Sequence, residues 1–197
     1  MCNNERSEIK ERKSEVRKEI IGRLRDQDPS LREERSKIIQ QKLLSSEEFK
    51  VSKTVMTYVS LPTEVSTDHL IEEALKLGKR VAVPCIGPLD EQKIIASELV
   101  AIESLEEGPF GIHQPKDGPV REIPLKEIDL VVVPAIAYDR KNMRLGRGKG
   151  YYDRFLSSKD LCSAKKVGLA FQFQVLDSLP SDDHDLAVDQ VVTDQSS

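Results

Sequence analysis

The segment DLVVVPAIAYD, residues 129–139, constrains the fold more than any other part of this chain. It contains the most apolar short run in the sequence, with no polar side chain between Leu130 and Ala137. A strand that is apolar on both faces is typical of the centre of a parallel sheet covered on each side by helices. Because proline cannot donate to a sheet ladder, Pro134 is expected at or beyond the end of this strand. The chain is therefore predicted to fold around one buried central strand.

Strand and helix patterns alternate along the chain on either side of that segment. Residues 54–61 (TVMTYVSL) have strand composition, residues 66–78 have helical apolar spacing that stops at Gly78, and residues 80–84 (RVAVP) give a second strand. This order predicts a parallel pair of strands joined by a helix. Further strands are expected at residues 92–99, 166–171 and 186–193, a helix at residues 151–158, and a turn-rich surface loop at residues 106–119.

The N-terminal residues are predicted to form a pair of helices. Residues 5–27 carry apolar side chains near helical period within a charge-rich sequence, which indicates a helix with one narrow buried stripe. A second helix follows, for which Ser30 and Glu33 offer a capping box and Leu31 and Ile38 are assigned, with other leucines, to the core side. The predicted fold is a single α/β domain over residues 1–197. It has a helical part at residues 5–50 and a core with a mostly parallel central sheet, flanked by helices, at residues 54–194.

Composition limits the kinds of partner. The net charge is −4, so general electrostatic attraction to nucleic acid or to an acidic membrane is not expected. The three cysteines, Cys2, Cys85 and Cys162, are widely spaced and match neither a disulfide framework nor a metal-ligand motif. No apolar run approaches the roughly 20 residues that span a bilayer, and the first residues lack the apolar stretch of a secretion signal. We expect a soluble, unprocessed cytoplasmic protein, with a mild preference for a monomer.

A glycine-rich basic stretch, RLGRGKGYYDR, occupies residues 144–154. Gly146, Gly148 and Gly150 permit backbone conformations closed to other residues and a close approach of ligand to main chain. Successive N–H groups in such a turn form an anion-binding nest. The helix expected from Tyr151 adds the positive end of its dipole at the same place. Five cations between Arg140 and Lys149 would repel one another without an anion among them. The stretch therefore favours a phosphate-rich ligand.

Two common nucleotide motifs do not fit this stretch. A P-loop needs Ser or Thr after the lysine, where this chain has Gly150, and the dinucleotide fingerprint GxGxxG needs glycine at position 151, where it has tyrosine. A surface turn with solvated basic residues is the alternative. The position of the stretch favours a site, because ligands of open α/β sheets bind beyond the carboxyl ends of the strands.

The ordered string RLGRGKGYYDR after VVVPAIAYD closely resembles the signature of the 5-formyltetrahydrofolate cyclo-ligase family, also called methenyltetrahydrofolate synthetases. The resemblance covers nearly the whole chain and includes KSEVR (13–17), SLPTEVST (60–67), GIHQP (111–115) and HDLAVDQVVTD (184–194). It implies an ATP-dependent ring closure between N5 and N10 of a reduced folate, with Mg²⁺ as cofactor. Phosphorylation of the formyl oxygen by ATP would make that oxygen a leaving group, so no protein nucleophile is required.

The resemblance also implies which residues bind each ligand. For ATP it implies Lys13, Arg17, Arg144, Leu145, Gly146, Arg147, Gly148, Lys149, Gly150, Tyr151 and Tyr152. For the folate substrate it implies Val59, Glu64, Phe110, Arg147, Gly148, Lys149, Gly150 and Tyr151. Arg147 and Lys149 are the catalytic candidates, because their charges suit the transferring phosphoryl group. For Mg²⁺ the resemblance implies Asp153 and Asp185, which have the oxygen ligands this ion prefers.

Several of these positions have a plain structural alternative. Lys13 and Arg17 are four apart on one helix face and alone would be solvated charges. Val59 could be strand core, and Tyr152 could be helix packing. Asp153 could interact with the dipole of its helix or pair with Arg154 or Arg147. Asp185 could cap a loop or reach the metal through water. Phe110 stands where some relatives have tryptophan, which leaves its contact open.

Two other functions compete with the ligase. One is a nucleotide- or RNA-binding paralogue with the same fold and no activity, which should show gaps in the motif. The other is a sugar-phosphate isomerase of similar architecture, which needs a carboxylate base and no ATP. Fold alone does not exclude either.

Overall fold

A computed structural model describes residues 3–87, 93–108, 111, 113–115, 120–182 and 185–195 of the 197-residue chain. Its centre is a six-stranded sheet in the order β11-β9-β6-β1-β2-β3, with all neighbours parallel except the antiparallel pair β2 and β3. The strands are β1 (Thr54–Met56), β2 (Arg80–Ile86), β3 (Ile94–Leu99), β6 (Leu130–Val133), β9 (Lys165–Ala170) and β11 (Gln190–Thr193). The predicted α/β fold with a mostly parallel central sheet is confirmed.

β6 is the buried centre of this sheet, as the apolar run predicts, and Pro134 directly follows it. Leu130 and Val132 belong to one hydrophobic cluster, whereas Val131 and Val133 belong to a second. Successive side chains of a strand point to opposite faces of a sheet. Both faces of β6 are therefore covered by core.

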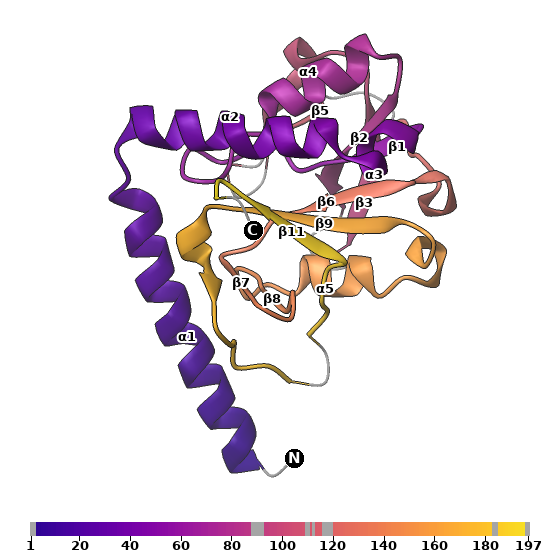
Figure 1. The fold of residues 1–197 in the computed structure, drawn as a ribbon. Helices are drawn as coiled ribbons and strands as arrows, with labels where there is room; N and C mark the ends of the chain where they lie inside the picture. Colours follow the sequence, from indigo (N-terminus) through magenta and orange to yellow (C-terminus); the bar gives the residue numbers. More distant parts are fainter. Residues whose placement is uncertain are drawn as a thin grey trace.

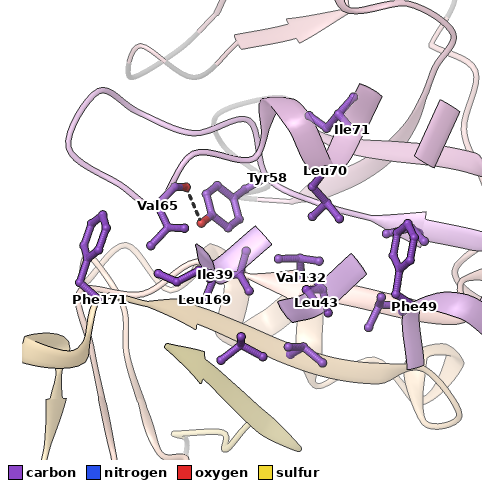
Figure 2. Packing of buried hydrophobic residues seen from close by; sticks show 14 of the residues in the cluster. Ile39, Leu43, Phe49, Tyr58, Val65, Leu70, Ile71, Val132, Leu169 and Phe171 are labelled. Carbon is purple, nitrogen blue, oxygen red and sulfur yellow. Dashed lines mark hydrogen bonds between the residues drawn. The ribbon is translucent and has the colours of Figure 1, made fainter. Parts of the chain in front are cut away.

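Helices cover both faces of the sheet (Figure 1). α2 (Pro29–Ser45), α3 (Glu47–Val51) and α4 (Asp68–Lys76) contribute to the first cluster, and α5 (Tyr151–Leu156) contributes to the second. Figure 2 shows Ile39 and Leu43 of α2 packing with Leu70 of α4 over Val132 and Leu169. α1 (Asn3–Arg25) joins the first cluster through Ile20 and Leu24 near its end, so the predicted narrow stripe is confirmed.

The predicted start and core face of the second helix need correction. Asp28 caps α2, because its Oδ1 accepts hydrogen bonds from the N–H groups of Ser30 and Leu31, and Pro29 opens the helix. Of the residues expected on the core side, Leu43 is buried, whereas Leu31 and Ile38 are exposed at 50% and 39%. Ile39, beside Ile38, is buried instead. A proline at the first helical position favours the earlier start.

Two predicted strands differ from the observed ones. Residues 54–61 hold only the short β1, because the chain leaves the sheet after Met56. The strand expected at residues 92–99 is confirmed as β3, which runs antiparallel to β2, since a short connection joins them. The expected strand at 186–193 pairs as β11 only from Gln190. The parallel pair β1 and β2 is confirmed.

Two smaller sheets complete the described structure. β7 (Ala137–Asp139), β8 (Arg144–Leu145) and β10 (Val175–Leu176) form one of them, so β7 lies between β6 and the glycine-rich stretch, whose first two residues form β8. β4 (Leu105–Glu107) and β5 (His113–Pro115) pair within the segment predicted as a loop. Short 3-10 turns are η1 (Ile102–Ser104), η3 (Leu125–Glu127), η4 (Lys159–Leu161) and η5 (Gln172–Gln174). Among the described residues, none of the helices combines the length and the apolar character that crossing a bilayer requires.

Candidate active site

A cavity of about 280 Å³ opens at the carboxyl edge of the central strands. Residues that follow β1 and β6, and the last residues of β2, form one part of its wall, and the glycine-rich stretch forms another. The lining residues are Tyr58, Val59, Leu61, Glu64, Pro84, Ile86, Ile94, Pro134, Ala135, Arg144, Gly146, Arg147, Gly148, Lys149, Gly150, Tyr151, Tyr152 and Asp153. This is the sheet edge at which the α/β topology predicts a ligand.

The glycine-rich stretch makes a tight turn between β8 and α5. Gly148 and Gly150 have φ values of 90° and 72°, in the left-handed region that glycine adopts without strain. Arg17 of α1 reaches this turn and donates from Nε to the carbonyl oxygen of Gly146 at 2.8 Å. The predicted neighbourhood of Arg17 and the glycines is therefore present in the structure.

Arg144 is buried beneath the turn. Its Nη2 donates to Asp153 Oδ1 and its Nη1 donates to the carbonyl oxygen of Pro134 at 3.1 Å. Its Nε is buried and has no hydrogen-bond partner within the part of the chain that the structure describes. A cation held this firmly supplies a fixed positive potential to the cavity that it lines.

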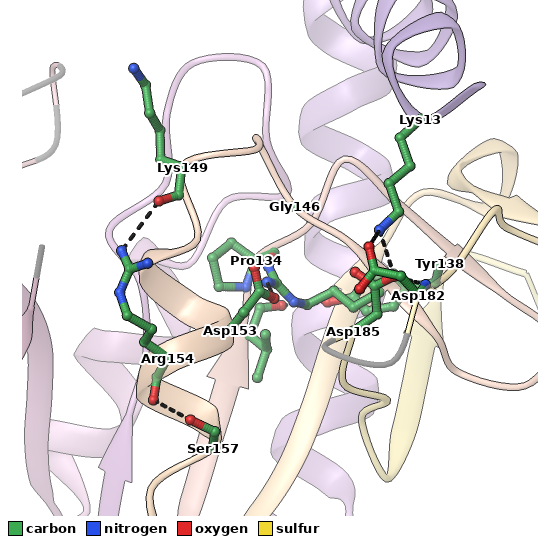
Figure 3. Close-up of polar contacts among 12 residues, drawn as sticks. Lys13, Pro134, Tyr138, Gly146, Lys149, Asp153, Arg154, Ser157, Asp182 and Asp185 are labelled. Atoms are coloured by element: carbon green, nitrogen blue, oxygen red, sulfur yellow. Dashed lines mark hydrogen bonds and ion pairs between the residues drawn. The ribbon is translucent and has the colours of Figure 1, made fainter. Parts of the chain in front are cut away.

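Lys13 pairs with two carboxylates of the C-terminal segment in this structure, and its role in ATP binding stays a prediction. Its Nζ donates to Asp182 Oδ2 at 2.8 Å and to Asp185 Oδ2 at 2.6 Å, and the side chain does not line the cavity (Figure 3). Burial alone would lower the pKa of Lys13, but the hydrogen bonds to the two carboxylates outweigh it and raise the pKa. For Arg17, burial lowers the pKa, and the nearby Asp185 and Asp153 oppose that effect.

Glu64 lies on the wall opposite the turn. Its Oε2 accepts a hydrogen bond from the N–H of Leu61 at 3.0 Å, while its own N–H donates to the Leu61 carbonyl. Its Oε1 accepts from Arg147 Nη2 at 2.7 Å. The side chain of Glu64 is 13% exposed and that of Arg147 is 48% exposed. A proposed folate ligand and a proposed catalytic cation therefore form an ion pair across the cavity.

The remaining predicted positions are distributed as follows. Val59, Tyr151 and Tyr152 line the cavity, and burial raises the pKa of Tyr152 well above its ordinary value, which keeps its hydroxyl protonated. Leu145 is buried in the core and is not among the lining residues. Phe110 lies outside the described residues.

Sequence reasoning missed an apolar part of the wall. Pro84 and Ile86 at the end of β2, and Ile94 at the start of β3, line the cavity beside Val59. The rule that ligands bind at carboxyl ends of strands could have pointed to the end of β2. Ile94 depends on the antiparallel return of β3, which the sequence did not reveal.

The two proposed metal ligands have different ion-pair partners in this structure. Asp153 lines the cavity and pairs with Arg144, whereas Asp185 pairs with Lys13 and is not a lining residue. No group of three or more His, Cys, Asp or Glu side chains suited to a metal ion occurs among the described residues. A carboxylate at a phosphate site still fits Mg²⁺, which is commonly held by one or two carboxylates together with substrate phosphates and water. Asp153 meets this condition as a lining residue, and the metal contact of Asp185 stays a prediction.

The fold and this cavity define an α/β protein with a cationic, glycine-rich ligand site at the carboxyl edge of a parallel sheet. The chain belongs to the 5-formyltetrahydrofolate cyclo-ligase family, whose model matches residues 9–194. It is 32% identical to the 5-formyltetrahydrofolate cyclo-ligase of Mus musculus, with 92% of this chain and 93% of the mouse protein covered. It is 31% identical to the cyclo-ligase of Escherichia coli K12, with 71% and 77% covered.

Solved structures agree with this assignment. The 5,10-methenyltetrahydrofolate synthetase of Aquifex aeolicus matches with a TM-score of 0.81 and 35% identity, over 93% of this chain and 90% of that one. The Mycoplasma pneumoniae synthetase matches with a TM-score of 0.72 at 24% identity, over 93% and 99%, and supports the fold alone. The chain is an enzyme of the cyclo-ligase type, and this family uses ATP as a co-substrate.

Proposed function

We propose that this enzyme converts 5-formyltetrahydrofolate and ATP to 5,10-methenyltetrahydrofolate, ADP and phosphate in the cavity lined by Glu64 and the glycine-rich turn. The observation that carries the proposal is the Arg147–Glu64 ion pair. It joins the glycine-rich turn, which suits a phosphate, to the wall of the cavity at Glu64, which suits a pterin. The carboxylate of Glu64 can accept hydrogen bonds from pterin N–H groups, and the apolar residues beside it suit an aromatic ring system.

The chemistry needs activation of a poor electrophile. A formamide carbonyl resists attack by N10, and its oxygen is a poor leaving group. Transfer of the γ-phosphoryl group to the formyl oxygen forms a P–O bond and breaks the bond to ADP. N10 then bonds to the formyl carbon and loses its proton, while the C–O bond breaks and phosphate leaves. Positioning and fixed electrostatics are what the protein must supply.

Each part of the turn has a task in this reaction. Arg147 and Lys149 stabilise negative charge on the transferring group, and Arg144 adds the potential of a buried cation. Gly146, Gly148 and Gly150 allow the backbone to approach the phosphates. Tyr151 contacts the folate side, and Arg17 holds the turn from α1. We assign Lys13 an indirect part, because it holds the segment of Asp182 and Asp185 beside Arg17.

Mg²⁺ is part of the proposal, with Asp153 as its protein ligand. Arg144 contacts Oδ1 of this carboxylate, so Oδ2 is the oxygen available to a cation. The ion would neutralise charge on the phosphates of ATP. Asp185 would take part only through water or after Lys13 moves away.

The deciding experiment adds 5-formyltetrahydrofolate, ATP and Mg²⁺ to the purified protein and follows the near-ultraviolet absorbance of the methenyl product. Absorbance should develop only with all three present. Intact ATP binding without any absorbance change would refute the proposed reaction and favour a non-catalytic binding module.

We further propose a cytoplasmic monomer that binds neither nucleic acid nor membrane. The net charge of −4 supports the absence of nucleic acid. Of the large exposed apolar residues that the structure describes, Leu31 and Ile38 share α2, whereas Val51, Leu77 and Val100 are far apart in the sequence. Light scattering after size exclusion should give the mass of one chain, and a doubled mass would refute the monomer.

A further inference from the structure

Each glycine of the turn lies against the guanidinium group of a different arginine. A Cβ atom on Gly146 would lie 2.8 Å from Arg144 Nη1, and one on Gly148 would lie 3.4 Å from the Arg17 guanidinium carbon. A Cβ atom on Gly150 would lie 2.9 Å from Nη1 of a third arginine, Arg154. Arg144 and Arg17 already belong to the proposed ATP site, whereas Arg154 has no assigned part.

Arg154 contacts the turn from outside the cavity. Its Nη2 donates to the carbonyl oxygen of Lys149 at 3.3 Å, and its guanidinium carbon lies 5.7 Å from the centre of the Tyr151 ring. It is not among the residues that line the cavity, although Lys149, Gly150 and Tyr151 are. Figure 3 shows Arg154 and Asp153 directed to different sides of α5, and the Lys149 carbonyl directed toward Arg154.

The geometry of a peptide unit extends this contact to the other side of the turn. The described residues contain no cis peptide bond, and in a trans peptide the N–H points opposite to the C=O of the preceding residue. A Lys149 carbonyl directed at Arg154 therefore turns the Gly150 N–H away from Arg154, toward the cavity side. Arg17 acts in the same way at the N-terminal end of the turn. Its hydrogen bond to the Gly146 carbonyl turns the Arg147 N–H away from α1.

We infer that Arg154 is a positioning residue for nucleotide binding. Its guanidinium group holds the Lys149 carbonyl out of the phosphate site, presents the Gly150 N–H to a phosphate oxygen and fixes the Tyr151 ring. A carbonyl that turned inward would place a partial negative charge against the phosphate, so its orientation affects affinity. This inference rests on the proposed function, since it takes ATP as the ligand of the turn.

The test compares Mg·ATP binding by the full chain and its Arg154→Ala variant, measured by titration calorimetry without folate. Loss of the hydrogen bond from Arg154 to the Lys149 carbonyl should weaken Mg·ATP binding about five-fold, the size expected from one hydrogen bond. In steady state the KM for ATP should rise by a similar factor, while kcat and the KM for 5-formyltetrahydrofolate stay within about two-fold. Arg154→Lys, which keeps a donor and a charge, should recover part of the affinity.

Arg80→Ala is the matched control, because it removes a partly exposed arginine at the start of β2 whose partners, Glu98 and Glu127, lie outside the cavity. It should bind Mg·ATP like the unaltered chain. Equal ATP affinity in Arg154→Ala and the unaltered chain would overturn the inference. The inference would also be overturned if the KM values for ATP and for 5-formyltetrahydrofolate rose equally and both Arg154 variants had a lowered melting temperature. That result would indicate a purely structural role for Arg154. Absence of Mg·ATP binding by the unaltered chain would instead refute the proposed function.

Discussion

Arg147 Nη2 lies 2.7 Å from Glu64 Oε1, although the two residues are 83 positions apart in the sequence. Glu64 is held by the turn at Leu61, and Arg147 is the half-exposed partner that can move. In the proposed reaction, Glu64 binds the pterin and Arg147 binds the transferring phosphoryl group. The ion pair must therefore reorganise when both ligands enter, which links the two ligand sites through one contact.

Glu64→Gln should raise the KM for 5-formyltetrahydrofolate by about ten-fold, because a neutral amide replaces a charged acceptor. The same change should tighten Mg·ATP binding in the absence of folate, since Arg147 loses the carboxylate that neutralises it. Steady-state kinetics and calorimetry measure the two effects. Glu73→Gln, at a partly exposed carboxylate on α4 paired with Lys76, serves as the control and should change neither. Weaker ATP binding by Glu64→Gln would contradict the proposed competition for Arg147.

Lys149→Ala should lower kcat by about 100-fold, the loss seen when one donor to a developing charge is removed. Lys149 lines the cavity, and the proposed function assigns its ammonium group to the transferring phosphoryl group. The absorbance assay gives kcat and KM for the variant, with Lys159→Ala, on the exposed turn η4, as the matched control. Unchanged kinetics in Lys149→Ala would remove this residue from the phosphoryl-transfer step.

Local patterns in the sequence predicted much of the fold. The apolar run at Leu130–Val133 located the central strand, and Pro134 marked its end, because both signals act within a few residues. The direction of β3 and the length of β1 escaped prediction, since strand pairing depends on neighbours that are distant in sequence. The role of Asp28 as the N-cap of α2 was also not predicted, because Ser30 and Glu33 fit the sequence pattern of a capping box equally well.

The site was less predictable than the fold. The glycine-rich stretch predicts a phosphate-binding turn, since its glycines and cations lie close together in the sequence. The contacts of Lys13 with Asp182 and Asp185 span 169 and 172 positions, and no local pattern signals them. Burial then decides the outcome, because a lysine removed from water needs carboxylate partners. Lys13 therefore holds the C-terminal segment in this structure, and its contact with ATP stays a prediction.

Lys13→Met should lower the free energy of unfolding by about 2 kcal/mol near neutral pH, less than for a fully buried pair because Asp182 is one third exposed. The carboxylates raise the pKa of Lys13 above 10.5, so its ionised form stabilises the folded state. This stabilisation is fully present below the unfolded pKa and is lost as the pH rises through the folded pKa. The difference between the two proteins should therefore stay constant up to about pH 10 and shrink above it.

Urea unfolding at several pH values measures this difference. Lys76→Met is the matched control, because Lys76 forms a pair with Glu73 on the surface of α4 and its loss should leave stability nearly unchanged. A stability difference for Lys13→Met that grows above pH 10.5 would have the wrong sign and would refute the ion-pair account.

Gly146→Ala should weaken both the fold and ATP binding, although a single methyl group is added. The new Cβ atom would lie 2.8 Å from Arg144 Nη1 and 3.1 Å from Nη2, closer than atoms pack without displacement. Arg144 is buried and bonded to Asp153 and the Pro134 carbonyl, so its guanidinium group cannot move without losing a partner. We expect about 1–2 kcal/mol lower stability and about ten-fold weaker Mg·ATP binding. Gly22→Ala is the control, since nothing lies within 4 Å of its Cβ position in α1 and the helix should gain about 0.5–1 kcal/mol. A Gly146→Ala protein with unaltered stability and ATP affinity would show that the close packing of Arg144 on the turn is not required.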